Sequence, residues 1–236
     1  MADIIRFKED SSMRAVILRI NSPGGGVGPT QEIFREVVKL KEKKKVFVSM
    51  GTSCASGGYY IASAADRLFA NPSTITGSIG VIMQLMIVED VLKKVGVKSN
   101  VIKAGIFKDA GSPFRDMTTA ERAYMEGVVG DIYEQFIKDI ATGRKMSVEE
   151  VREIAQGRMY TGAQAMRIGL VDDIGNFYDT VDALKSALGI KGTPTLVFAE
   201  RPFSFSRWLF GSISKDLIGE LTNRLSSYSL NFLMTP

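Results

Sequence analysis

A serine with small neighbours is the residue of this chain best suited to covalent chemistry. Ser56 follows an apolar, β-branched run and is flanked by Ala55, Gly57 and Gly58. Small neighbours would let a substrate carbonyl approach the hydroxyl, and bare N–H groups in such a turn can donate to an oxyanion. The same position also suits a helix cap, which is an ordinary role for serine. From these residues alone, the nucleophile and the cap interpretations both stay open.

The absence of histidine limits the base that such a serine could use. A Ser-His-Asp triad, a Cys-His dyad and a histidine-ligated zinc or haem are excluded within this chain, which leaves lysine, a carboxylate or a metal-bound water. A catalytic lysine must lose its proton near neutral pH, so its pKa must fall by roughly 3 units. Lys108 differs from most other lysines because it lies in a small and apolar loop. The carboxylate of Asp109 would oppose that change if it faced the amine.

The composition is typical of a soluble globular protein of one large domain or two small ones. The 236 residues are 45% hydrophobic and 24% charged, which excludes a disordered or collagen-like chain. The net charge of +4 is scattered, so we expect no nucleic-acid partner. The single cysteine, Cys54, cannot form an internal disulfide or a cysteine-cluster metal site. We find no signal peptide and no apolar run long enough to span a bilayer.

Alternating strands and helices predict an α/β layered fold with parallel strands. Strands expected at 15–20 and 46–50 each lead into a glycine-rich turn, and such strand ends are where α/β sheets hold ligands. Further strands are expected at 67–70, 80–83, 99–103 and 195–199. Helices are expected at 29–43, 59–65, 88–95, 118–142, 162–168 and 176–188, with a capping box beginning another at Ser147.

Two charged or apolar stripes allow more than one interpretation. The lysines between 39 and 45 form either a solvated helix end or a patch for an anionic partner, and the helix dipole favours the former.

In the tail, leucine or isoleucine recurs every four residues from 209 to 225, beside Trp208 and Phe210. This pattern predicts an amphipathic helix that packs against subunits or lies on a membrane surface. Because its polar face carries both signs of charge, we expect subunit packing first and lipid second.

Four short motifs stand in order along the chain. They are N-S-P-G-G-G at 21–26, A-S-G-G-Y-Y at 55–60, T-G-S-I-G-V at 76–81 and G-I-F-K-D-A-G-S-P at 105–113. In order and spacing they resemble the signal peptide peptidase A (SppA) family of serine proteases, over residues 13–188. The resemblance implies a Ser–Lys dyad without cofactor or metal. The residues that it implies are Ser56 as nucleophile, Lys108 as general base, Ser78 as the residue that orients the lysine, and Gly24, Gly25 and Gly57 as oxyanion-hole donors.

The resemblance also implies an architecture and a setting. The fold would be similar to the Clp protease and crotonase superfold of repeated β-α-β units. Residues 1–200 would form the peptidase domain, with its first strand-helix unit missing, and residues 201–236 the amphipathic tail. Family members form ring-shaped homo-oligomers, cleave remnant signal peptides and other hydrophobic peptides, and sit at the membrane with the catalytic domain outside the cytoplasm. The usual N-terminal anchor is not found in this sequence.

Two other functions are compatible with the same fold. A crotonase-like acyl-CoA enzyme would share the oxyanion hole but would use carboxylate bases, so Ser56 and Lys108 at the dyad positions argue against it. A non-catalytic, membrane-associated scaffold would keep the rings and lose the dyad, whereas both dyad residues are present here. The sequence therefore favours a serine endopeptidase.

Overall fold

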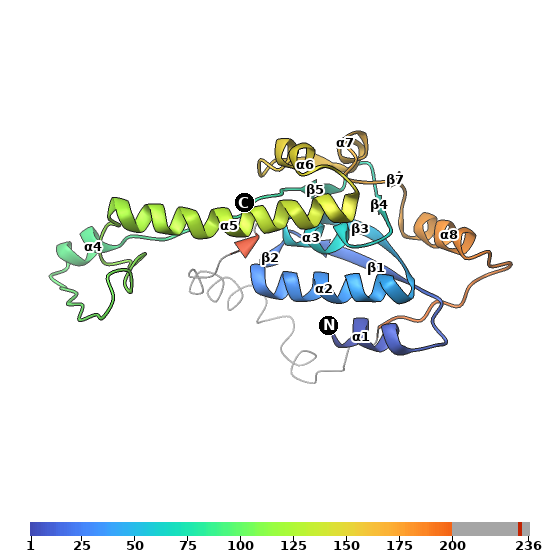
Figure 1. Ribbon diagram of the computed structural model, residues 1–236, viewed down its shortest axis with the longest axis horizontal. Helices are drawn as coiled ribbons and strands as arrows, with labels where there is room; N and C mark the ends of the chain where they lie inside the picture. Colours follow the sequence, from blue (N-terminus) through green and yellow to red (C-terminus); the bar gives the residue numbers. More distant parts are fainter. Residues whose placement is uncertain (200–230, 233–236) are drawn as a thin grey trace. The chain divides into compact units, whose positions relative to one another are not determined.

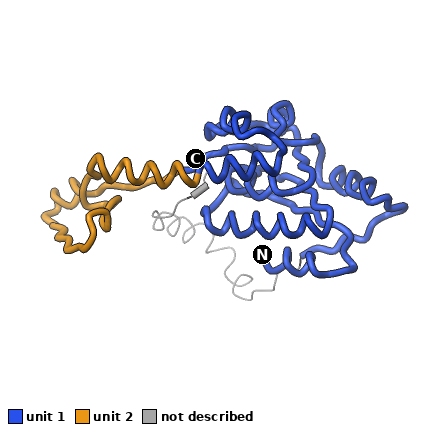
Figure 2. The backbone as a smooth tube through the Cα atoms, in the orientation of Figure 1, with its two compact units in different colours: residues 1–81, 133–201, 230–236 blue, residues 82–132, 202–229 orange. Residues whose placement is uncertain are grey.

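The computed structural model describes residues 1–199 and 231–232 (Figure 1). The tail predicted as an amphipathic helix, 201–236, lies outside the described residues except for 231–232. The described chain divides into two compact units (Figure 2). Unit 1 contains Met1–Val81, residues 133–199 and residues 231–232, and unit 2 contains Ile82–Ile132.

Unit 1 is built on a six-stranded sheet centred on the long strand β3, Lys45–Ala55. Strand β1, Ala15–Ser22, pairs with β3 in parallel. β4, Arg67–Ala70, and β5, Ile75–Gly77, also pair with β3 in parallel, β5 at its carboxyl end. The short strands β7, Asp173–Ile174, and β6, Met159–Thr161, extend the sheet beyond β4 and β5. Residues 46–51 of β3 are all buried, as expected for a strand covered on both faces.

Aromatic side chains pack the helices of unit 1 onto one another and onto the sheet. Helix α3, Gly57–Ser63, begins directly after β3 and carries Tyr60, whose ring lies 4.8 Å from that of Phe34 and 4.6 Å from that of Phe136. These partners belong to α2, Val27–Lys43, and α5, Thr119–Arg144. α3 is thereby fixed between two longer helices. Elsewhere, Leu184 of α8, Phe177–Ala187, joins a buried cluster with Phe47 and Phe69.

The remaining elements are short. They are α1 (Ala2–Glu9), β2 (Gly25–Gly26), α4 (Glu89–Lys94), α6 (Val148–Ile154), α7 (Gly162–Arg167) and β8 (Asn231–Phe232). The capping box predicted at Ser147 is confirmed, because its hydroxyl accepts from the Glu150 N–H at 3.1 Å and the Glu150 carboxylate accepts from the Ser147 N–H at 2.8 Å. Within the described residues, no helix is both long enough and apolar enough to cross a membrane.

The α/β class is confirmed, and three of the predicted strands are wrong. The segments 80–83, 99–103 and 195–199 form no strand beyond a single bridge at Ile82. Each contains β-branched residues, but none of them forms a continuous ladder with a neighbouring strand. By contrast, β5, β6 and β7 were not expected, because strands of two or three residues carry no pattern of their own.

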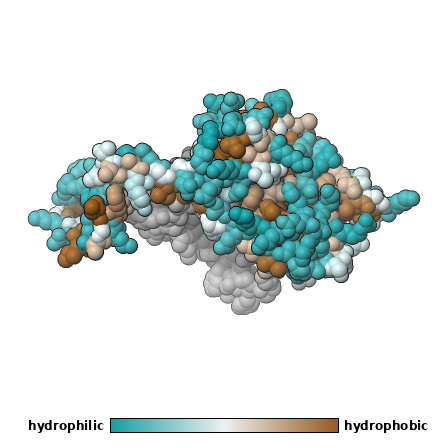
Figure 3. All heavy atoms as spheres, in the orientation of Figure 1, coloured by the Kyte–Doolittle hydropathy of each residue, from teal (hydrophilic) through white to brown (hydrophobic). Residues whose placement is uncertain are grey.

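Unit 2 lacks an apolar core among its described residues. None of the hydrophobic side chains of residues 82–132 is buried, whereas Ile102 is 99% and Ile106 79% exposed. Apolar atoms are visible on the face of this unit that Figure 3 presents. Individual contacts link its segments instead. The Val88 N–H donates to the Pro113 carbonyl at 2.7 Å, and the rings of Phe107 and Tyr124 lie 5.2 Å apart.

Candidate active site

Ser56 occupies a strained turn between β3 and α3. Its φ of 52° and ψ of −120° lie in a region that residues with a side chain rarely adopt. The turn is held by the backbone, since the Ser56 N–H donates to the Gly77 carbonyl at 2.8 Å and the Ser56 carbonyl accepts from the Tyr60 N–H at 2.9 Å. A strained backbone of this kind costs about 1–3 kcal/mol and occurs preferentially at functional sites.

The Ser56 hydroxyl does not act as a helix cap. Although Ser56 stands at the N-cap position of α3, its side chain accepts no hydrogen bond from the first turn. Among the described residues, its Oγ is the one buried side-chain polar atom without a hydrogen-bond partner. Leaving a buried hydroxyl unpaired costs about 1–3 kcal/mol, which a purely structural serine would have no reason to bear. This geometry favours the nucleophile interpretation over the cap.

Two other side chains near the end of β3, those of Cys54 and Ser53, are poorer nucleophiles than Ser56. Burial raises the pKa of the Cys54 thiol well above its ordinary value, so the reactive thiolate is not available at neutral pH. Ser53 is partly buried, and its hydroxyl donates to the Ser22 carbonyl at 3.4 Å. Among the described residues at this strand end, Ser56 therefore offers the one buried hydroxyl without a partner.

Ser78 lies beside Ser56 because of the strand register. Ala55 of β3 pairs with Gly77 of β5, so the two serines follow neighbouring parallel strands. Ser78 also has a positive φ, 50°, and its N–H donates to the Arg158 carbonyl at 2.8 Å. In the part of the chain that the structure describes, the Ser78 side chain has no hydrogen-bond partner. It is placed where it could orient a group that approaches Ser56.

The glycine turn after β1 lies against the start of α3. A Cβ added at Gly57 would stand 2.8 Å from the Thr30 hydroxyl oxygen and 3.3 Å from the Gly25 nitrogen. The backbones of Gly25 and Gly57 thus lie close together beside the Ser56 turn. The Gly24 N–H is already used, because it donates to the Ser22 hydroxyl at 3.2 Å.

An extended segment of the chain pairs with this turn. β2 and β8 form a two-stranded antiparallel ladder in which Gly25 faces Phe232 and Gly26 faces Asn231. The edge of β2 therefore accepts main-chain hydrogen bonding from an added strand, next to the Ser56 turn. Strand addition of this kind is a common mode of peptide recognition.

Lys108 lies in unit 2, in the loop between α4 and α5. It is exposed, and its N–H donates to the Gly105 carbonyl at 3.2 Å. Its ammonium group bonds to none of the described residues, and neither does the Ser56 hydroxyl. The structure thus gathers Ser56, Ser78 and the glycine donors in unit 1, while Lys108 belongs to unit 2.

A charged cluster of unit 2 was not foreseen from the sequence. The Asp109 carboxylate binds Arg115 and Lys103, and Arg115 also binds Glu121 in the first turn of α5. The available signal was the capping pair of Thr118 and Glu121, which places a carboxylate at the start of this helix.

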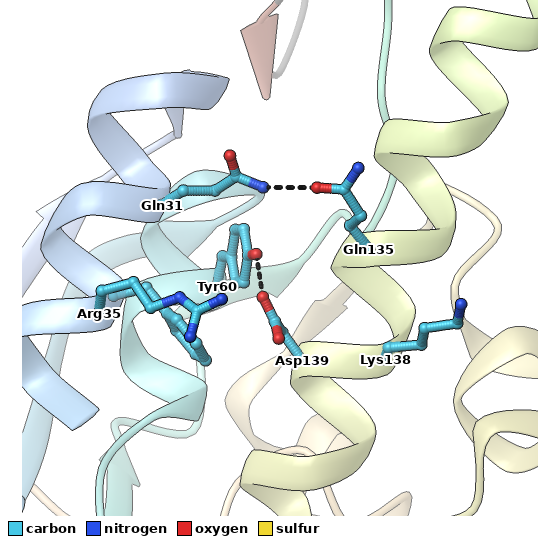
Figure 4. A pocket seen from close by; sticks show the side chains of 7 residues that line it. Gln31, Arg35, Tyr60, Gln135, Lys138 and Asp139 are labelled. Atoms are coloured by element: carbon cyan, nitrogen blue, oxygen red, sulfur yellow. Dashed lines mark hydrogen bonds between the residues drawn. The ribbon is translucent and has the colours of Figure 1, made fainter.

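A polar cavity of about 280 Å³ lies between α2, α3 and α5 of unit 1 (Figure 4). The Gln31 amide donates to the Gln135 side-chain oxygen at 3.1 Å, and the Tyr60 hydroxyl donates to the Asp139 carboxylate. None of the predicted site residues lines this cavity. Its walls instead include Tyr60, which lies one turn beyond Ser56. The hydrogen bonds across this cavity therefore help to hold α3 in place.

A strained serine between a strand and a helix, with glycine N–H groups beside it, is the arrangement of a serine hydrolase. The sequence model of Peptidase family S49 matches residues 38–191, and the chain belongs to this family. The resemblance to SppA proteases is thereby confirmed, and the prediction of a serine peptidase is supported by the names of its relatives.

Three relatives illustrate the similarity. A putative protease of Synechocystis is 44% identical over 72% of this chain and 62% of its own length. A putative signal peptide peptidase SppA of Enterococcus faecium is 35% identical over 91% of this chain and 63% of its own length. Protease 4 of Haemophilus influenzae is 36% identical over 74% of this chain and 28% of its own length. The chain therefore spans less than two thirds of the length of these relatives.

Proposed function

We propose that this chain is a serine endopeptidase in which Ser56 is the nucleophile and Lys108 the general base. The observation that carries the proposal is the buried, unpartnered Ser56 hydroxyl on a strained turn. Ser78 would orient the lysine amine, and the N–H groups of Gly25 and Gly57 would form the oxyanion hole. Lysine is the appropriate base because the chain has no histidine.

Acylation would use each of these groups once. The Ser56 oxygen attacks the carbonyl carbon of the scissile peptide bond while its proton passes to the neutral amine of Lys108. The negative charge that develops on the carbonyl oxygen accepts hydrogen bonds from Gly25 and Gly57. When the intermediate collapses, the C–N bond breaks, the lysine ammonium protonates the leaving amine, and an ester to Ser56 remains.

Deacylation would repeat the sequence with water as the nucleophile. Lys108, neutral again, accepts a proton from water while the water oxygen attacks the ester carbonyl carbon. The ester bond to Ser56 then breaks and the serine oxygen takes the proton back. The products are a free carboxylic acid and the unmodified enzyme, so no cofactor is consumed.

The substrate that we propose is an extended, hydrophobic peptide such as a remnant signal peptide. Its main chain would pair with β2, at the edge that β8 occupies, which brings a scissile bond next to the Ser56 turn. A relative is named a putative signal peptide peptidase, which agrees with such a substrate. The corresponding location is the cell envelope, with the catalytic domain outside the cytoplasm and in contact with the membrane surface.

A ring-shaped homo-oligomer is part of the proposal. Support comes from unit 2, where apolar side chains that include Val91, Val95 and Ile102 are more than half exposed. Exposed apolar side chains that form a contiguous patch usually mark a partner surface. Contact with further copies of this chain would cover it.

Labelling with a fluorophosphonate probe tests the proposed nucleophile. The probe should modify Ser56, and Ser56→Ala should abolish both labelling and hydrolysis of a hydrophobic peptide. Ser53→Ala is the matched control, because it removes a neighbouring hydroxyl from the same strand and should remain active.

Two outcomes would overturn the proposal. Modification at Ser53 or Cys54, or turnover retained in Ser56→Ala, would remove Ser56 from the chemistry. A folded protein that neither labels nor hydrolyses peptides would instead agree with a scaffold.

A further inference from the structure

The carboxylate next to Lys108 is held by two cations. Asp109 accepts a hydrogen bond from the Arg115 Nε at 3.0 Å, and a second Arg115 nitrogen lies 2.9 Å from its other oxygen. Lys103 also binds this carboxylate and donates to the Ile106 carbonyl at 3.0 Å. Hydrogen bonds from Arg115 and then Lys103 hold the pKa of Asp109 well below its usual range. The negative charge beside Lys108 is thus permanently present and already paired.

Arg115 is itself fixed by a buried carboxylate. Its two terminal nitrogens donate to both Glu121 oxygens, at 2.8 and 2.5 Å, and Glu121 is only 3% exposed. The Glu121 carboxylate also accepts from the Thr118 N–H at 2.9 Å, at the start of α5. A planar guanidinium can bind two carboxylates at once, which a lysine ammonium cannot do with the same geometry. The loop after Lys108 is therefore tied to the first turn of α5.

We propose that Arg115, anchored by Glu121, is a positioning residue that keeps the Asp109 carboxylate away from the Lys108 amine. The inference rests on the proposed function, since it concerns the protonation of the proposed base. It explains how a lysine could serve as a base beside Asp109, whose carboxylate would otherwise favour the charged form of the amine. Arg115 touches neither substrate nor reacting atoms, and acts only through Asp109.

The charge balance around the loop gives the direction of the effect. The charged residues from 103 to the first turn of α5 are Lys103, Lys108, Asp109, Arg115, Asp116, Glu121 and Arg122. An unpaired carboxylate close to an amine favours the charged ammonium, which cannot accept the Ser56 proton. Loss of Arg115 would leave Asp109 paired with Lys103 alone and would remove a neighbouring cation. Both changes make the amine harder to deprotonate.

The test is the pH profile of peptide hydrolysis by the full chain. In Arg115→Gln, the alkaline-rising limb should move up by about 0.5 to 1 pH unit, so activity on that limb falls about threefold to tenfold at fixed pH. KM should change little, because Arg115 does not contact substrate. Adding Asp109→Asn to Arg115→Gln should return the limb to its original position, which loss of loop structure alone would not allow.

Matched variants distinguish the loss of the Asp109 contact from a general loss of positive charge. Arg122→Gln removes a nearby cation, in the first turn of α5, that does not bind Asp109, and it should leave the limb unmoved. If Arg115→Gln does not fold, Arg115→Lys replaces it and should shift the limb less in the same direction. An unshifted limb in a folded Arg115 variant, or no return with Asp109→Asn, would overturn the inference. Turnover in Lys108→Ala would instead overturn the proposed function.

Discussion

The two units of this protein hold their parts of the candidate site by different means. In unit 1, buried side chains such as Val48, Tyr59 and Phe136 surround the strand and helix that meet at Ser56. In unit 2, the described apolar side chains all remain accessible, and Glu121 is the only buried side chain among the described residues. The serine is therefore positioned by a dry core, and the loop of Lys108 by ion pairs and hydrogen bonds.

This difference has a functional consequence. A core keeps a strained turn in place, because the surrounding packing outweighs a local cost of about 1–3 kcal/mol. Ion pairs that are partly open to water stabilise far less and respond to pH and salt. The nucleophile side of the site should therefore be rigid and insensitive to solution conditions, whereas the base side should depend on its charges and on whatever covers its apolar surface.

Removing one phenylalanine from each unit should give the largest contrast in stability. Phe69→Ala empties a buried site in unit 1 and should lower the free energy of unfolding by about 3–5 kcal/mol. Phe107→Ala removes a ring that is 44% exposed and contacts Tyr124, so it should cost about 1 kcal/mol or less. Urea unfolding of the two variants measures both costs. Equal costs would contradict the contrast between the units.

A methyl group at Gly57 should disturb catalysis more than stability. Gly57→Ala places a Cβ 2.8 Å from the Thr30 hydroxyl oxygen and 3.3 Å from the Gly25 nitrogen, so Thr30 or the Gly57 backbone must shift and the Gly25 backbone is crowded. Loss of one oxyanion-hole donor lowers kcat by about 10²–10³. Gly28→Ala is the matched control, because its Cβ meets nothing within 4 Å. Similar turnover in the two variants would separate Gly57 from the oxyanion hole.

The stability that the ion pairs of unit 2 contribute should be lost at acidic pH. Hydrogen bonds from Arg115 and from the Thr118 N–H lower the pKa of Glu121 from 4.5 to about 2. A carboxyl whose pKa is depressed on folding stabilises the folded state above its ordinary pKa, and this contribution is lost as pH falls from about 4.5 to about 2.

The Thr118 amide, which donates to Glu121, reports this titration by NMR. Its chemical shift should change with a midpoint near pH 2 in the unmodified protein and at a higher pH in Arg115→Gln. A midpoint at the ordinary value of 4.5 in both proteins would show that Arg115 does not hold this carboxylate.

Local sequence patterns predicted most helices and the longer strands of the sheet, and failed at the strands of two or three residues. β1, α2 and the helix capped by Ser147 carry their own periodicity or capping residues. β5 is only three residues long and depends on the end of β3, whereas the segment 99–103 lacks a partner strand among the described residues. Pairing between distant segments decides such cases, and no local window contains that information.

The candidate site was predictable as a set of residues and unpredictable in its details. The motifs led to Ser56, Ser78 and Gly57, which the register of β3 with β5 and the approach of β2 bring close together. That the Ser56 hydroxyl is unpartnered depends on every neighbour in the fold, so local sequence could not dismiss the cap alternative. The pairing of Asp109 with Arg115 likewise depends on how the loop closes onto α5.

The most direct test of the division between a rigid nucleophile and a charge-dependent base is the pH dependence of Ser56 labelling. A fluorophosphonate probe reports the reactivity of the serine without any requirement for a particular peptide. In the unmodified protein, the labelling rate should rise from pH 6 towards pH 8 or 9, since the lysine ammonium must lose its proton before it can accept that of Ser56. In Lys108→Arg, labelling should be lost at every pH, because a guanidinium keeps its proton. Equal labelling rates in the two proteins, or a rate independent of pH, would contradict the account.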